Sequence, residues 1–389
     1  MSAEDPLAIG SRLSQEVLVP MKEAFVEKDE IIDLLGLCLL GGENLFILGP
    51  PGTAKSALVH ELGQRFAGQT FEYLLTRFTE PNELFGPFDI RKLRDGVLET
   101  NTEGMLPEAS LVFLDELLNA NSAILNSILT VLNERVLRRG RETHHLPLLM
   151  VVGASNHLPE EEALQALFDR FLLRVRSDNV TSDELGSVLE AGWRLEQKSP
   201  SGTASTLSPD DIRIVHDFLS QIDLSPIRDV YLEAIERIRR AGLRLSDRRA
   251  VKLQRLIAAS ALLCERKEAR VSDLWILRYI WDLEEQAEII RAIVDEILER
   301  EMESEAGDGD HPRSRENEPP DAETLAARLH ELEEVLGKLS GDDPPARSQL
   351  RDQLSLVSSR SQWVTNEHQR QSLQNHIDRL WKNLGPTAP

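Results

Sequence analysis

The sequence predicts an α/β fold in its first half and an α-helical fold in its second half. Three short, continuously apolar runs, at residues 45–48, 111–114 and 148–152, alternate with amphipathic stretches up to about Val175. A parallel sheet that is covered by helices on both faces requires strands of this kind. After about Ser177 the strand-like runs stop and only helical patterns follow.

The elements of both halves follow from local signals. Residues 1–40 predict a helical lead-in that ends in an apolar helix around Ile31–Leu40, which the Gly-rich stretch 41–44 then breaks before the first strand. In the second half, residues 208–211 (Ser-Pro-Asp-Asp) have the form of a helix N-terminus. Helices are expected near residues 209–221, 227–241, 247–265 and 272–299.

The C-terminal part predicts a linker followed by two amphipathic helices. Residues 301–323 are rich in Glu, Asp, Gly and Pro, a composition typical of a disordered acidic linker. The apolar residues beyond it keep to one face of each helix, namely Leu325, Leu329, Leu332, Leu336 and Leu339, and Leu373, Ile377, Leu380, Trp381 and Leu384. These helices form either a hairpin that packs on itself or on the body, or a docking module for a partner.

Composition favours a cytoplasmic protein with protein partners. With 44 basic and 66 acidic side chains the net charge is −22, so no nucleic acid partner is expected, because nucleic acid binding relies on neutralising phosphates. No apolar run is long enough for a transmembrane segment, and the acidic N-terminus does not resemble a signal peptide. Cys38 and Cys264, in apolar surroundings, are expected to be buried thiols.

A phosphate-binding loop follows the first strand directly and opens a helix, as such loops do. Its residues are Gly49, Pro50, Pro51, Gly52, Thr53, Ala54, Lys55 and Ser56. Lys55 is suited to the β- and γ-phosphate oxygens of ATP, and the Ser56 hydroxyl to Mg²⁺. Ala54 stands where the usual pattern has Gly, and its Cβ costs about 1–2 kcal/mol if the residue is left-handed.

Polar side chains also end the two later strands. Asp115 and Glu116 close the run at 111–114. Asp115 is expected to bind Mg²⁺, directly or through water, and Glu116 to orient and deprotonate the attacking water. Asn156 closes the third run, where an amide beside the γ-phosphate helps to position that water. Each of the two later signals is weak alone, and together with the loop, at this order and separation, they predict ATP hydrolysis.

At this point the sequence resembles the MoxR branch of the AAA+ ATPases, and RavA-like members most closely. The resemblance covers roughly residues 7–300. The alanine before the loop lysine is itself usual in that family. The motifs that carry the resemblance are GPPGTAKS (49–56), FEYLLTRFTEPNELFGP (71–87), LVFLDE (111–116), AILNSILTVLNER (123–135), GASNHLPEE (153–161) and ALFDRF (166–171).

The resemblance implies roles that spacing alone does not give. Asn156 matches the sensor 1 position, and Arg170 matches an arginine finger that reaches the γ-phosphate of the neighbouring subunit. Arg248 matches the sensor 2 arginine, although the adjacent Arg249 leaves the register open. Because one arginine comes from the next subunit, the resemblance implies a homo-oligomeric ring, expected to be a hexamer.

The resemblance also implies a domain organisation. Residues 1–177 would form the AAA+ nucleotide-binding core and residues 178–300 an α-helical lid, followed by the linker and a C-terminal segment, 324–389. Within the core, residues 80–104 match the helix-2 insert and residues 136–147 the pre-sensor-1 hairpin. The basic tip of that hairpin either faces a pore or is solvated. His144 and His145 are expected to be surface residues, since no further Cys or His lies at metal-site spacing.

The function implied is ATP-driven remodelling, maturation or activation of protein complexes. Members of the family typically work with a von Willebrand factor A domain protein, and this chain lacks the Asp-x-Ser-x-Ser motif of that domain, so the partner would be separate. Two alternatives remain at this stage. One is a DNA-acting ATPase of the helix-2-insert group, and the other is an adaptor that binds ATP without hydrolysing it.

Overall fold

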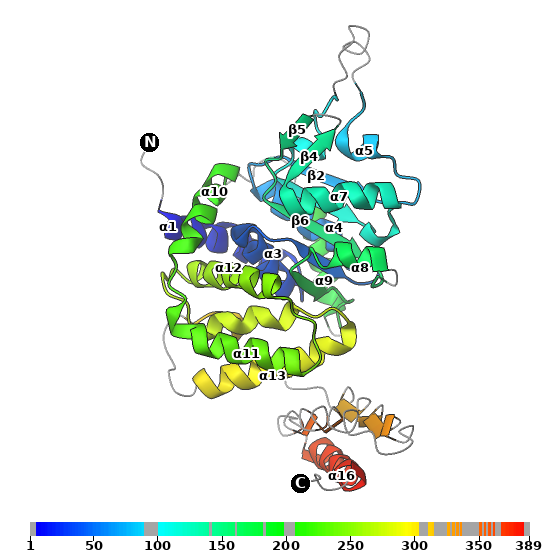
Figure 1. The fold of residues 1–389 in the computed structure, drawn as a ribbon, viewed down its shortest axis with the longest axis vertical. Helices are drawn as coiled ribbons and strands as arrows, with labels where there is room; N and C mark the ends of the chain where they lie inside the picture. The colour runs from blue at the N-terminus through cyan, green and yellow to red at the C-terminus, as the bar shows by residue number, and fades with distance from the viewer. Residues whose placement is uncertain are drawn as a thin grey trace.

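The structure is a computed structural model that describes residues 5–88, 100–139, 142–159, 162–181, 184–197, 207–302 and 310–314, with parts of 325–384. Figure 1 shows a sheet covered by helices, a helical layer beside it, and a separate group of helices at the C-terminus. No helix in the described ranges is both long and apolar enough to cross a membrane.

A parallel five-stranded sheet forms the centre of the first half, in the order β2-β3-β6-β1-β7. Its strands are β1 (Leu45–Leu48), β2 (Thr70–Leu74), β3 (Leu111–Asp115), β6 (Met150–Ser155) and β7 (Leu173–Arg176). The residues of β1 and β6 are all buried, as the continuous apolar runs predict. The predicted α/β class is therefore confirmed.

Helices cover the sheet and lead into it. The elements before the first strand are α1 (Pro6–Arg12), the π-helix η1 (Leu13–Leu18), α2 (Val19–Ala24) and α3 (Asp29–Gly41). Those within the sheet region are α4 (Lys55–Arg65), α5 (Pro81–Phe85), η2 (Leu106–Glu108), η3 (Leu117–Asn119), α7 (Ser122–Glu134) and α8 (Glu162–Phe168). From Ile31 onward α3 is buried, and it lies against a helix of the second half. That approach needs a small residue, because a Cβ on Gly41 would lie 2.5 Å from Leu256 Cδ2.

Both predicted inserts lie partly outside the described residues. β4 (Val136–Arg139) and β5 (Glu142–His145) pair antiparallel, which is the arrangement expected of the hairpin at 136–147, and its tip is not described. Phe88 and Thr100 form an antiparallel bridge at the base of the other insert, whose residues 89–99 are likewise outside the described ranges.

The second half is helical, with one difference from the expected pattern. Its elements are α9 (Leu185–Gln197), α10 (Pro209–Phe218), η4 (Leu219–Gln221), η5 (Ser225–Ile227), α11 (Arg228–Arg240), α12 (Asp247–Leu263), η6 (Val271–Tyr279) and α13 (Glu284–Met302). Ser208 and Asp211 form the capping box that the sequence predicts. The helix expected near 272–299 is split into η6 and α13 by residues 280–283.

A buried arginine explains this break. Arg174 on β7 is fully buried and donates hydrogen bonds to the carbonyl oxygens of Ile280 (3.3 Å) and Trp281 (2.9 Å), which a regular helix would use internally. It also forms an ion pair with Asp282 (2.9 Å). Burial lowers the pKa of Arg174 to about 9. Arg249 of α12 binds the same Asp282 and the same Ile280 carbonyl, so two guanidinium groups join the sheet to the helical half at one point.

The predicted linker is wrong for residues 310–314, which are anchored to the body. His311 is buried and stacks on Trp275, with ring centroids 4.6 Å apart, and burial lowers the pKa of His311 to about 4. Arg313 Nε lies 2.6 Å from Asp33 Oδ2, and Pro312–Ser314 form a short 3-10 helix, η7. An acidic, Pro-rich composition did not reveal these contacts, because each depends on a partner far away in the chain. Residues 303–309 and 315–323 lie outside the described residues.

The C-terminal apolar residues pack into a cluster of their own. The cluster contains Leu325, Leu329, Leu332, Leu350, Leu354, Val357, Leu373, Ile377 and Leu380, with Leu336 partly buried against it. It joins the predicted faces to α16 (Glu367–Leu384) and adds a segment around 350–357 that the sequence did not indicate. Trp381, predicted to lie on the apolar face, is 36% exposed. The cluster favours helices that pack on one another.

The two cysteines form no disulfide. Cys38 is buried in α3, and Cys264, expected to be buried, is only half-buried after α12. Burial raises the pKa of both thiols. Neither has the lowered pKa that marks a reactive cysteine.

Candidate active site

The three chemical motifs meet at one edge of the sheet. The phosphate-binding loop follows β1, Asp115 and Glu116 end β3, and Asn156 follows β6, and these strands are neighbours and parallel. Their carboxyl ends therefore lie side by side, which is where open α/β sheets place their ligands. The structure thus brings together Lys55, Asp115, Glu116 and Asn156 from three separate parts of the sequence.

Lys55 lies at the centre of this group. Its Nζ donates to the carbonyl oxygens of Gly49 (2.6 Å) and Pro50 (2.8 Å) and to Asn156 Oδ1 (3.3 Å). Burial lowers the pKa of Lys55, whereas the charges of Asp115 and Glu116 raise it. The ammonium group is thus held by the loop itself and is partly stripped of water, which strengthens its attraction for an anion.

The loop is shaped to surround an anion. Gly49 passes so close to the chain that a Cβ there would lie 2.2 Å from the Ser177 carbonyl oxygen, so only glycine fits. Gly52 is exposed, with φ +84° and nothing within 4 Å of where its Cβ would stand, so one side of the loop is open. The first-turn N–H groups of α4 have no side-chain cap from Ala54, and Ser56 is exposed beside them. Such a helix start binds phosphate groups well.

Ala54 is in the left-handed conformation, with φ +65° and ψ +18°. A Cβ is unfavourable in a left-handed residue, so Ala54 carries the strain expected of this conformation. Among the described residues Glu116 also has a positive φ, +51°, so two residues of the same site are strained. Strain of this kind persists only where the surrounding structure fixes it, and it is common at functional sites.

We expect Ala54→Gly to raise the free energy of unfolding by about 0.5–1 kcal/mol. Removing the Cβ relieves about 1–2 kcal/mol of left-handed strain, and the greater freedom of glycine in the unfolded chain offsets about half of it. Denaturant titration measures the change. Gly52→Ala is the matched control and should be destabilising by about 1 kcal/mol, because it adds strain at a positive φ without a clash. A loss of stability in Ala54→Gly would contradict the assignment of strain.

Glu116 is held by two side-chain amides. Asn156 Nδ2 donates to Glu116 Oε1, and Asn119 Nδ2 donates to Glu116 Oε2 at 3.0 Å. Asp115 Oδ1 accepts from the Glu116 backbone N–H at 2.9 Å. Asn119 was not among the site residues predicted from the sequence. Its position three residues after Glu116, in a tight turn, was the available signal. Since Asn156 also binds Lys55, one chain of hydrogen bonds runs from Lys55 to Glu116.

Arg170 lies at the opposite edge of the sheet from its own phosphate-binding loop. It precedes β7, and its carbonyl oxygen accepts from Asn44, the residue before β1, at 3.3 Å. The flanking Phe168 and Phe171 pack edge-on against Phe46 of β1. Because β1 spans four residues and the rise between neighbours is about 3.3 Å, its first and last Cα atoms are about 10 Å apart. An arginine side chain does not bridge that length.

Arg170 is partly open to solvent. Its side chain is 27% exposed and lies 3.8 Å from Asp169 Oδ2, and its Nε is buried without a hydrogen-bond partner. Of the two candidate sensor 2 residues, Arg249 is buried in the network with Asp282, whereas Arg248 is exposed on the first turn of α12. The geometry therefore leaves Arg248, and not Arg249, available to a ligand. His144 is exposed, as expected.

This fold and this site define a nucleotide-binding protein of the AAA+ class, and the comparisons name its family. A family model described as the MoxR domain in the MoxR-vWA-beta-propeller ternary systems matches residues 11–217, more than half of the chain. A model of the AAA lid domain matches residues 225–294. The chain belongs to the MoxR family of AAA+ ATPases.

Known relatives agree with this assignment. An uncharacterized protein of Methanocaldococcus jannaschii is 34% identical over 289 residues, which is 74% of each chain. The chaperone MoxR1 of Mycobacterium tuberculosis is 27% identical over 166 residues, 41% of this chain and 43% of that protein. The crystal structure of a putative ATPase from Cytophaga hutchinsonii shares the fold, with a TM-score of 0.60 and 20% identity, over 77% of this chain and 97% of the other. Membership of the RavA-like subgroup stays a prediction.

Proposed function

We propose that the chain hydrolyses ATP in an oligomeric ring and uses the energy to remodel, mature or activate protein complexes. The observation that supports it most is the chain of hydrogen bonds from Lys55 through Asn156 to Glu116. In this chain the Lys55 ammonium group, which is suited to the γ-phosphate, and the Glu116 carboxylate, which is suited to the attacking water, both bind the Asn156 amide.

In this proposal the phosphate-binding loop, residues 49–56, holds the triphosphate of ATP. The backbone N–H groups at the start of α4 and the Lys55 ammonium face the phosphates. Ser56 and Asp115 would hold Mg²⁺, and they fit this role because both are accessible oxygen donors, one next to Lys55 at the start of α4 and the other at the end of β3. When bound, Mg²⁺ neutralises charge on the β- and γ-phosphate oxygens.

Glu116 would act as the general base. Its two oxygens are fixed by Asn119 and Asn156, so the carboxylate has one orientation before ATP binds. Both amides donate to the carboxylate oxygens and so hold them in place beside the Lys55 ammonium group. Asn156 would at the same time orient the water, because it lies between the carboxylate and the lysine. Asn119 is proposed here as a positioning residue.

In the ring, a neighbouring subunit would supply a further positive charge at the γ-phosphate. Arg170 does not reach its own site, and a neighbouring subunit would bring this group to the γ-phosphate, with Arg248 of the helical domain as a further contact. A closed ring requires a head-to-tail interface, which places one edge of each subunit against the opposite edge of the next. An arginine supplied in trans calls for a neighbouring subunit, and the family favours a ring of six.

The partner is proposed to be a von Willebrand factor A domain protein. The matching family model is described by its occurrence in systems that combine MoxR, this domain and a β-propeller, and one relative is named a chaperone. The net charge of −22 also favours protein over nucleic acid partners. We propose that these events take place in the cytoplasm.

We expect ATP turnover per subunit to rise with protein concentration and to follow the mass of the assembly measured by light scattering. The reason is that an arginine finger contributes about 10³–10⁵ in rate, and a dissociated subunit lacks it. A chelator of Mg²⁺ should abolish turnover, and single-stranded DNA at physiological salt should leave it unchanged. Turnover that stays constant per subunit as the assembly dissociates would contradict the ring, and stimulation by DNA would favour the DNA-acting alternative.

A further inference from the structure

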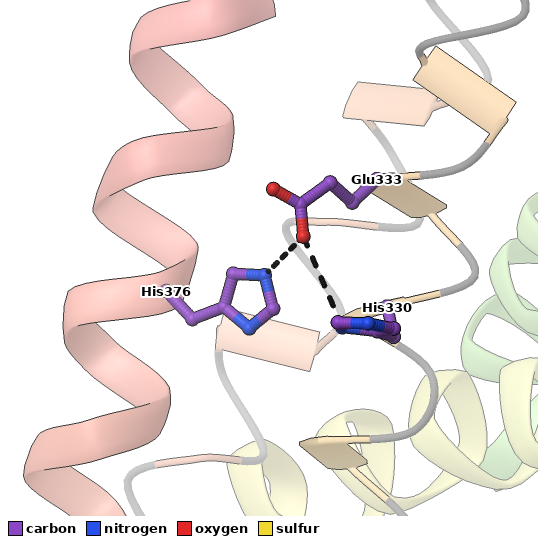
Figure 2. Close-up of side chains that lie close together, drawn as sticks. All are labelled: His330, Glu333 and His376. Atoms are coloured by element: carbon purple, nitrogen blue, oxygen red, sulfur yellow. Dashed lines mark hydrogen bonds and ion pairs between the residues drawn. The ribbon is translucent and has the colours of Figure 1, made fainter.

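Two histidines and a glutamate converge on the C-terminal helices, far from the nucleotide site. His330 and Glu333 belong to the helical segment that begins near Leu325, and His376 lies on α16 (Figure 2). Their spacing of three residues puts His330 and Glu333 on one face of that segment, facing His376. Sequence spacing does not reveal this group, because His376 is separated from the other two by more than forty positions.

The donor atoms are close together. Glu333 Oε2 lies 3.0 Å from His376 Nε2 and 3.9 Å from His330 Nδ1, and one ligand atom from each residue lies within 4.8 Å of the others. Ligands about 2.0–2.2 Å from a tetrahedral zinc ion stand roughly 3.4 Å from one another. The three donors therefore need only small side-chain rotations to share one ion.

We propose that His330, Glu333 and His376 bind a zinc ion. Two imidazoles and one carboxylate are a known zinc donor set, in which water takes the fourth position. Mg²⁺ and Ca²⁺ prefer oxygen ligands, so a site with two nitrogen donors is unsuited to them. The side chains are 77%, 39% and 20% exposed for His330, Glu333 and His376 respectively, so the ion can enter from solvent and keep a bound water.

The ion would fasten two segments of a small bundle. The apolar cluster around Leu329 and Ile377 belongs to a segment of fewer than seventy residues, and cores of that size are only marginally stable without a metal or another cross-link. His330 follows buried Leu329 and His376 precedes buried Ile377, so the site lies at the rim of this cluster. Metal binding would join the first helical segment directly to α16 and order the bundle.

The test is a zinc titration of the full chain, free of tag and nucleotide and treated with a chelator beforehand. Competition with a chromophoric chelator should give one zinc ion per chain. His330→Ala, Glu333→Gln and His376→Ala should each weaken binding at least about tenfold, the loss that even changes beyond the direct ligands can cause. Zinc should also raise the thermal midpoint of the bundle in the wild type and not in the variants, since a ligand stabilises only the state that binds it.

A second histidine–glutamate pair provides the matched control. His60 Nδ1 lies 3.1 Å from Glu72 Oε1 on α4 and β2, and no third metal ligand lies beside this pair in the described residues. His60→Ala should leave zinc affinity unchanged. Glu333→Gln keeps an oxygen that can accept from His376, so a helical circular dichroism spectrum equal to that of the wild type excludes misfolding as the cause of a loss. Equal zinc affinity in the wild type and in the triple variant would overturn the proposal.

Discussion

Replacing Glu116 by glutamine is expected to lower steady-state ATP turnover by about 10²–10⁴-fold, the range that a general base contributes. Glutamine has the size of glutamate, and its carbonyl oxygen can accept from Asn119 or Asn156, so the site should keep its shape. What it loses is the ability to take a proton. Binding of ATP should remain near the wild-type level, because Lys55 and the loop are unchanged.

Single-turnover hydrolysis and binding of a fluorescent ATP analogue measure the two effects separately. Glu265→Gln is a suitable control, because Glu265 is also a left-handed glutamate, with φ +58°, and it contacts Ser11 outside the site. It should hydrolyse ATP at the wild-type rate. If Glu116→Gln kept more than about half of wild-type turnover, Glu116 would not be the base. An absence of turnover in the wild type itself would favour the adaptor that binds ATP without hydrolysing it.

The sequence predicts those strands of the sheet whose residues are nearly all buried. β1, β3 and β6 are continuous apolar runs, and they appear within three residues of the expected ranges. β2 has an exposed Glu72 and only one fully buried residue, Phe71, so its signal is weaker. β7 carries Arg174, a charge that no sequence pattern places in a core. Its burial depends on the carbonyl oxygens of Ile280 and Trp281, which lie more than a hundred positions away in the sequence. A local sequence pattern does not predict a contact of that range.

The same distinction applies to the site. The phosphate-binding loop and the acidic strand end are local patterns, and the structure brings them together as the order of parallel strands requires. The pairing of Asn119 with Glu116 depends on the exact turn after β3, which side-chain spacing does not specify. The choice between Arg248 and Arg249 depends on Asp282, and no feature of the two adjacent arginines themselves distinguishes them.

Arg170→Ala is expected to lower turnover in the assembled ring by about 10³-fold or more, while ring mass and ATP binding are unchanged. The geometry gives the reason, because Arg170 lies at the edge of the sheet where β1 and β7 begin, and the loop lies where β1 ends. Steady-state turnover and light scattering on the same sample measure both properties. Arg213→Ala removes an exposed arginine that also pairs with an aspartate and should have no effect.

Mixing the two inactive variants decides whether the arginine acts in trans. A Glu116→Gln subunit keeps Arg170 and can offer it to a neighbouring Arg170→Ala subunit, whose own Glu116 is intact. In randomly mixed rings about a quarter of the sites combine both groups, so turnover should return to about a quarter of the wild-type value. No recovery in rings that demonstrably exchange subunits would place Arg170 outside the catalytic site. Recovery would mean that one subunit cannot complete its own site. The reason is that the sheet holds Glu116 and Arg170 at opposite edges, so that the arginine of each site comes from the next subunit.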